Sequence, residues 1–110
     1  MPTVYVTQES NGRNFLPARK YGDLVALMPY NAQVVLSASP AIRKLRRGLR
    51  NFTKDDYLLL SGDPIIMGIA ISIALDNSQG KGKFLKWDKL EKDYYEVAID
   101  IHEKGELEYD

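Results

Sequence analysis

The amino-acid sequence predicts an α/β fold: a small two-layer sandwich with a mixed, mostly parallel sheet, two crossover helices and a C-terminal antiparallel strand. From residue 33 onward, apolar runs of strand length alternate with helical patterns, and this order favours parallel pairing through crossover helices. In the last run, 94–101, apolar residues recur at every second position, which is typical of an edge strand with one face in water. The 110 residues show no linker or composition shift, so we expect one domain over 1–101 and a polar acidic tail over 102–110.

The N-terminal third predicts strands separated by a long loop. Residues 3–8 alternate between apolar and polar side chains, which indicates a short strand. Residues 9–23 contain glycine and proline without an apolar period, and this composition predicts a long loop. Two apolar runs, 24–28 and 33–37, flank the turn residues 29–32, so we expect two strands there that a hairpin turn could join.

Two helices begin with the same device. Ser39 at the N-cap and Pro40 at the first helical position predict a helix over 39–52, whose apolar residues recur at spacings of three and four. Asp63 and the proline after it predict a second helix over 64–77, which stops at a run of turn residues.

Three of the predicted strands form the parallel part of the sheet. The run 57–61 is continuously apolar, as expected of a strand covered on both faces. We expect it to pair in parallel with 33–37 and with 83–88, with the two helices as right-handed crossovers. The remaining strand, 94–101, follows the polar loop 89–93.

The composition excludes several classes of function. The chain has no cysteine, which excludes disulfides, thiol catalysis and cysteine-ligated metal. It has one histidine, His102, beside the acidic tail, where we expect a solvated side chain. Asp55 and Asp56 fit a turn before a strand, and Asp63 fits a helix cap. The residues therefore favour a protein without catalytic residues, cofactor or metal, and not an enzyme.

No targeting or membrane-spanning segment is visible in the sequence. The N-terminus lacks a basic region followed by an apolar one, as a signal peptide requires. The most apolar stretch, 65–75, is short of the roughly 20 residues that cross a bilayer. We therefore expect a soluble cytoplasmic protein that does not contact membranes.

The zero net charge hides an asymmetry along the chain. Residues 1–87 hold twelve Lys and Arg against six Asp and Glu, a net charge of +6, and residues 88–110 hold three against nine, a net charge of −6. A neutral protein can therefore carry a strong local positive field. The acidic C-terminal part could equally lie against the basic helix and cancel that field.

The positive charge is densest on the first predicted helix. Its basic residues lie opposite the apolar face and form one stripe: Arg43, Lys44, Arg46, Arg47 and Arg50. Arginine is preferred where phosphates or carboxylates are held in a planar fork. The predicted loop 9–23 adds basic residues interleaved with aromatic ones, a mixture that suits single-stranded nucleic acid: Arg13, Phe15, Arg19, Lys20 and Tyr21. The stripe therefore predicts binding to nucleic acid, with an acidic protein partner or internal pairing as alternatives.

A short internal sequence repeat suggests a third class of site. The segments LSASPAI and LSGDPII share the pattern L-S-x-[S/D]-P-x-I, and both lie where a strand turns into a helix. Such turns present free N–H groups that hold anions. A small anionic ligand could therefore bind at Ser37, Ser39, Ser61 and Gly62. Two good helix starts explain the same pattern, and neither turn has the glycines of a phosphate loop.

The second helix predicts an oligomer. It is apolar on all sides, and a helix of this kind must be buried on all sides. One sheet layer covers only one face, so the other face needs the helix 39–52, the N-terminal loop or another subunit. We expect the last, a homodimer that uses Met67, Ile71 and Leu75.

Over about half the chain, the sequence resembles a known group of proteins. The segments VVLSASPAIRKLRRGL, DDYLLLSGDPIIMGIAISIA and KFLKWD resemble short uncharacterised proteins of tailed bacteriophages, including marine ones. The resemblance implies a phage accessory protein made in the cytoplasm of a bacterial host. It implies no catalytic residues, and it is compatible with binding to nucleic acid or to a host protein.

Overall fold

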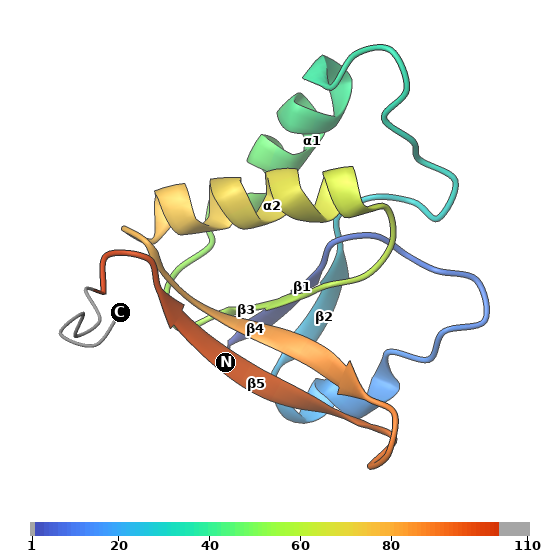
Figure 1. The fold of residues 1–110 in the computed structure, drawn as a ribbon, viewed down its shortest axis with the longest axis vertical. Helices are drawn as coiled ribbons and strands as arrows, with labels where there is room; N and C mark the ends of the chain where they lie inside the picture. Colours follow the sequence, from blue (N-terminus) through green and yellow to red (C-terminus); the bar gives the residue numbers. More distant parts are fainter. Residues whose placement is uncertain (1, 104–110) are drawn as a thin grey trace, which may run out of the picture.

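The computed structural model describes residues 2–103 and contains one five-stranded sheet, two α-helices and a short 3-10 helix. In chain order, the elements are β1 (Thr3–Val6), η1 (Leu16–Lys20), β2 (Asp23–Ala26), α1 (Ser39–Leu49), β3 (Tyr57–Leu59), α2 (Pro64–Asn77), β4 (Lys81–Asp88) and β5 (Asp93–Asp100). The strand order is β2-β1-β3-β4-β5. The first four strands pair in parallel, and β5 pairs antiparallel with β4 at the edge (Figure 1). The predicted fold class is therefore confirmed.

The N-terminal strand lies inside the sheet, between β2 and β3. Val4 pairs with Leu24 on one side and with Tyr57 on the other. Because side chains alternate along a strand, Tyr5 packs into the core beneath the helices, whereas Val4 and Val6 pack into a second core on the opposite face. Both faces of β1 are therefore covered.

Helices α1 and α2 cover one face of the sheet (Figure 1). Their buried residues, among them Leu45, Leu49 and Ile66, form the larger core with Leu58 and Phe84 of the sheet. The spacings of three and four residues on α1 therefore place its apolar side toward the sheet, as the sequence analysis predicted.

The second face is covered by the segment that the sequence analysis predicted as a loop. Within it, η1 buries Ala18, and Phe15 and Tyr21 pack against the smaller core. Phe15 is half-buried at the start of the turn, and Pro17 occupies an early position in η1, where its missing N–H costs no hydrogen bond. This segment is short, but it gives the sheet a partial third layer.

Helix α2 begins as predicted. Asp63 is the N-cap, and its Oδ1 accepts a hydrogen bond from the Ile65 N–H at 2.7 Å. Pro64 follows in the first turn, where proline is well tolerated. The helix spans Pro64–Asn77, which agrees with the predicted bounds.

Helix α1 differs from its prediction at both ends. The N-cap is Ala38, not Ser39, and it makes no side-chain hydrogen bond to the first turn. The Ser39 N–H instead donates a hydrogen bond to the Oγ of Ser37, in the preceding loop, at 3.2 Å. At the other end, the helix stops at Leu49, and Phe52 packs into the core from the turn that follows. The predicted N-cap and the end at residue 52 are therefore wrong.

The predicted strand 33–37 and its hairpin with 24–28 are also wrong, because 33–37 is part of an irregular connection from β2 to α1. Val35 and Leu36 are 74% and 98% exposed, so the apolar run does not face the core. The start of the connection is held by Gln8, whose Nε2 donates to the carbonyl oxygens of Pro29 and Ala32 at 2.9 and 2.8 Å. These carbonyl groups thus have partners without any strand pairing.

The rest of the predicted sheet is closer to the structure. β3 and β4 are parallel and α2 connects them, as predicted, whereas the other parallel neighbour of β3 is β1. β3 ends at Leu59 rather than at residue 61, and β4 begins at Lys81 rather than at residue 83. His102 lies beside Gly80 at the end of the described chain, and 104–110 of the predicted tail lie outside the described residues.

Candidate functional site

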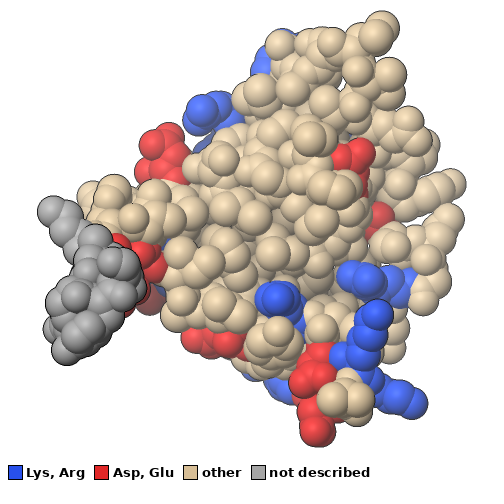
Figure 2. Space-filling model, viewed as in Figure 1, with Lys and Arg blue, Asp and Glu red and all other residues tan. Residues whose placement is uncertain are grey.

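The four basic residues of α1 and its C-cap residue Arg50 form one exposed surface. The side chains of Arg43, Lys44, Arg46, Arg47 and Arg50 are all exposed, opposite the buried Ala41, Leu45 and Leu49. We call these five residues the arginine surface. In Figure 2, Lys and Arg side chains lie at the upper edge of the molecule, near α1.

No carboxylate among residues 2–103 forms an ion pair with the arginine surface, because the single pair found there joins Lys20 and Asp93. The acidic residues between 88 and 100 belong to β4, β5 and their turn, at the other end of the sheet from β2. None of these residues forms an ion pair with α1. The acidic residues beyond 103 lie outside the described residues.

The basic and aromatic residues of the predicted loop lie elsewhere. Phe15 and Tyr21 pack on the face of the sheet opposite α1, and Arg13, Arg19 and Lys20 come from the same segment. Tyr21 lies 5.1 Å from Tyr57, ring centre to ring centre, and its hydroxyl donates to the Tyr94 carbonyl oxygen at 3.1 Å. The structure therefore gives these two rings a packing role and does not join the segment to the arginine surface.

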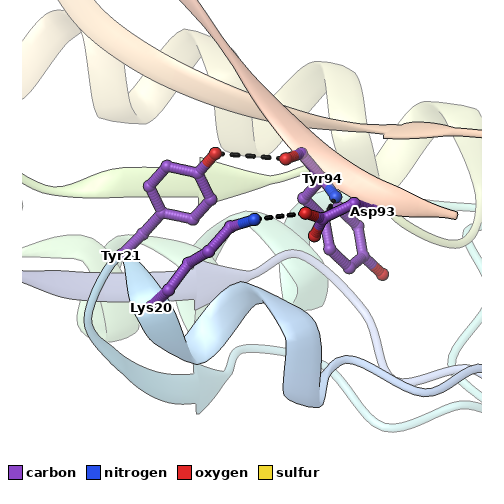
Figure 3. Close-up of polar contacts among 4 residues, drawn as sticks. All are labelled: Lys20, Tyr21, Asp93 and Tyr94. Atoms are coloured by element: carbon purple, nitrogen blue, oxygen red, sulfur yellow. Dashed lines mark hydrogen bonds and ion pairs between the residues drawn. The ribbon is translucent and has the colours of Figure 1, made fainter. Parts of the chain in front are cut away.

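Lys20 and Asp93 attach η1 to the start of β5 (Figure 3). The Lys20 ammonium donates to the Asp93 carboxylate, and the Tyr94 N–H donates to the same side chain at 2.8 Å. These two donors hold the pKa of Asp93 below its usual value, and the carboxylate raises the pKa of Lys20. Both groups are partly exposed, so this pair contributes little stability.

The residues predicted for a dimer interface on α2 are not equally available. Leu75 lies in the core of the monomer, and Met67 and Ile71 are half-buried. The outward face instead exposes Ile65, at 54%, together with Gly68 and Ser72. A groove of about 530 Å³ runs between α1 and α2, lined by Ile42, Arg46, Pro64, Ile65, Gly68, Ile69, Ser72 and Ile73. Figure 2 shows a broad area without charged side chains over α2.

The residues of the two strand-to-helix turns lie in different surroundings in the structure. Ser37 and Ser39 are exposed in the connection to α1. Ser61 is buried, and its backbone N–H and carbonyl both bond to the Thr7 hydroxyl, at 2.9 and 2.6 Å. At Gly62, with φ +96°, a Cβ would lie 2.2 Å from Gln8 Oε1, so Gln8 packs closely against this turn, and Gly62 lines a pocket of about 380 Å³ beside it.

Sequence reasoning missed the role of Gln8. This residue is buried, its Nε2 donates to two carbonyls of the connection after β2, and its Oε1 accepts from the Asp63 N–H at 2.7 Å. One side chain therefore links the segments that follow β1, β2 and β3. A polar residue that continues a strand has no periodic signal, and only the position of β1 inside the sheet could have indicated this role.

Sequence reasoning also missed a pocket at the carboxyl end of β4. It has a volume of about 390 Å³ and is lined by Ser10, Asn11, Gly12, Arg13, Asn14, Trp87 and Tyr94. The Trp87 and Tyr94 rings meet edge to face, with their centres 4.9 Å apart. Burial raises the pKa of Tyr94, and the positive charge of Arg13 opposes that shift.

Residues 2–103 contain no group of three or more side chains that could hold a metal ion. No helix in that part of the chain is long and apolar enough to cross a membrane.

The comparisons with known proteins give one match. A family model described as Phage Pam3 gp32-like protein matches residues 2–101. No curated protein and no solved structure matches the chain. The match covers nearly the whole sequence, so the resemblance to phage proteins is confirmed.

Proposed function

The chain belongs to the family of Phage Pam3 gp32-like proteins, and from this premise we propose that it is a non-enzymatic phage accessory protein that binds nucleic acid through α1. It would act in the cytoplasm of the infected bacterium. The proposal rests on one observation: five exposed cationic side chains on one helix face have no acidic partner within residues 2–103.

The type of residue supports phosphate as the group that is bound. Four of the five side chains are arginines, whose planar fork matches the oxygens of a phosphate. Phosphate contacts release condensed counterions, so the affinity should fall steeply with salt and depend little on base sequence. The helix is amphipathic, so these side chains can contact a ligand without disturbing Leu45 or Leu49 in the core.

A salt titration tests this proposal. We expect log K for DNA or RNA to fall linearly with log salt, by about 0.9 per phosphate contact on duplex and about 0.7 on single strands. Replacing Arg46 and Arg50 by glutamine should remove two contacts and flatten the slope by about 1.4 to 1.8. Both residues are exposed, so the fold should be unchanged.

The matched control removes the same charge from the other end of the sheet. Lys86 and Lys89 are exposed on β4 and in the turn after it, and replacing both by glutamine should leave the slope unchanged. If the protein binds no DNA or RNA at low salt, the proposal is wrong. Binding to an acidic protein, lost in the Arg46 and Arg50 variant alone, would then explain the same arginines.

We also propose that the protein is a homodimer that uses the outward side of α2. Between Pro64 and Leu75 this helix carries no charged residue, and Ile65 and the groove beside it are open to solvent. Gly68 and Ser72 would allow the backbone of a second copy to approach closely. A dimer would also place two arginine surfaces on one particle.

A further inference from the structure

The sheet has a topological switch point at its centre. From β1 the chain moves outward to β2, and it then returns to β3 on the other side of β1. The segment after β1 runs to η1 on one face, and the segment after β3 runs to α2 on the opposite face. In open α/β sheets, ligands bind in the crevice outside the carboxyl ends of the strands at such a point.

The segment after β1 borders two pockets at this edge. Ser10 and Asn11 line both of them. The first pocket has a volume of about 380 Å³. It is also lined by Tyr30, Asp63 and Gln8. The second is the pocket of about 390 Å³ at the carboxyl end of β4, with Arg13, Trp87 and Tyr94. Both volumes lie within the range of about 300–1,000 Å³ for small-molecule sites.

Tyr94 carries a hydroxyl group that has no hydrogen-bond partner among residues 2–103. The residue is 3% exposed, and its hydroxyl makes no hydrogen bond with any residue from 2 to 103. Figure 3 shows the ring extending away from Lys20 and Tyr21, whose contacts use the carboxylate of Asp93 and the backbone of Tyr94. A buried hydroxyl without a partner is unfavourable, and a bound ligand is one way to satisfy it.

The other two side chains define what such a ligand would be. Trp87 is 37% exposed and offers a flat surface for a planar group. Arg13 is exposed and lines the same pocket as Tyr94, and its positive charge opposes the rise in the pKa of Tyr94. Ser10, Asn11 and Asn14 add polar groups to the rim. A planar ring joined to an anion fits this combination.

We propose that the pocket formed by Arg13, Trp87 and Tyr94 binds a nucleotide, with the base stacked on Trp87 and the phosphate held by Arg13 and the Tyr94 hydroxyl. A nucleobase gives the planar ring with edges for the polar rim, and its phosphate gives the anion. The same chemistry is present in a free mononucleotide and in one residue of a single strand. The site shares no residue with the arginine surface, so it does not depend on the function proposed above.

The protein provides its own probe for this site. Trp87 is the only tryptophan in the chain, so its fluorescence reports on this ring alone, and the Arg13 variant assigns the signal to this pocket rather than to the neighbouring one that Trp87 also lines. We expect titration with AMP, GMP, CMP or UMP to quench this fluorescence to saturation. Arg13→Gln should weaken the binding about tenfold, because it removes the charged partner of the phosphate. Tyr94→Phe should weaken it less, by about two- to tenfold, while the ring packing keeps the fold intact.

Controls separate this proposal from simpler explanations. Ribose phosphate lacks the base and inorganic phosphate lacks base and sugar, so neither should quench Trp87. The Arg46 and Arg50 double variant should bind mononucleotides as the wild type does, and Arg13→Gln should keep the salt slope on duplex DNA. These two results keep a failure at the pocket distinct from a failure at α1.

The probe that quenches Trp87 fluorescence shows whether the site binds a free nucleotide or one residue of a strand. Saturable quenching by mononucleotides assigns the site to free nucleotides, and quenching by short single-stranded oligonucleotides alone assigns it to a strand. Both outcomes support the pocket, provided that Arg13→Gln weakens them. The proposal is overturned if no base-containing probe quenches Trp87 or if Arg13→Gln binds as tightly as the wild type.

Discussion

At the carboxyl edge of the sheet, the side chain of Gln8 connects several backbone segments by hydrogen bonds. Its amide contacts backbone groups after β2 and after β3, so a substitution would leave several partly buried groups without partners. We expect Gln8→Leu, which preserves much of the side-chain volume, to lower the free energy of unfolding by about 2–4 kcal/mol in urea denaturation.

Gln33→Leu is the matched control for this prediction. Gln33 is exposed in the same connection to α1, and its replacement should change stability by less than about 0.5 kcal/mol. Equal stability of the two variants would mean that the Gln8 contacts do not hold the edge together.

Two buried tyrosines predict how stability depends on alkaline pH. Burial raises the pKa of Tyr5, with a further contribution from Asp56, and burial also raises the pKa of Tyr94. A folded-state pKa above the unfolded value of about 10 leaves stability intact below that pH and lowers it as the pH rises further. The melting temperature should therefore fall above pH ~10.

Phenylalanine at both positions should remove part of that fall, because the rings remain and the ionising groups are gone. Tyr30→Phe, at an exposed ring, is the control and should leave the pH dependence as it is. A double variant with the same alkaline slope as the wild type would contradict the role of burial.

At the scale of elements, comparing the two helices shows how much a side-chain N-cap contributes to the free energy of unfolding. Asp63 caps α2 through its side chain, whereas the N-cap of α1 is Ala38, which has no side-chain acceptor. Asp63→Ala should therefore lower the free energy of unfolding by about 1 kcal/mol. Ser39→Ala, at the residue that the sequence indicated as the cap of α1, should have almost no effect in the same urea titration. A larger loss of unfolding free energy in Ser39→Ala than in Asp63→Ala would mean that Ser39, and not Asp63, acts as a helix cap.

The same two helices show which structural features could be predicted from local sequence signals. α2 was predictable because its cap, proline and apolar length are all local signals, and the exposed side of α1 was predictable from its period. The irregular path of 33–37 was not, because the turn before it is held by Gln8, a residue far away in the chain, through the Pro29 and Ala32 carbonyls. The packing of Phe15 and Tyr21 was hidden for a related reason. Their partners lie on β3 and β5, and no local period marks them.

For the whole molecule, the sequence predicted the class of the fold but not the position of its first strand. The order of elements from residue 33 onward indicated parallel pairing, and it could not show that β1 enters between β2 and β3. The pocket of Arg13, Trp87 and Tyr94 could not be predicted for that reason, because it assembles only where the segment after β1 meets the end of β4.

Association of whole molecules is tested on α2. Light scattering at roughly tens of micromolar should give the mass of a dimer. Ile65→Lys places a charge on the outward side of α2 and should give the monomer mass with the fold retained. Leu90→Lys, at a still more exposed position in the β4–β5 turn, should remain a dimer. A monomeric wild type would contradict the proposed interface.

The central position of β1 also sets the order in which the protein can be made. Val4 leaves the ribosome early, but its partner Tyr57 is synthesised about fifty residues later, which at about 5–20 residues per second takes roughly 3–10 s. During that interval a strand that is buried on both faces in the native protein has only the short β2 beside it. Nascent chains that end before β3 should therefore be cut readily by protease, and resistance should arise in one late step when β3 and β4 arrive.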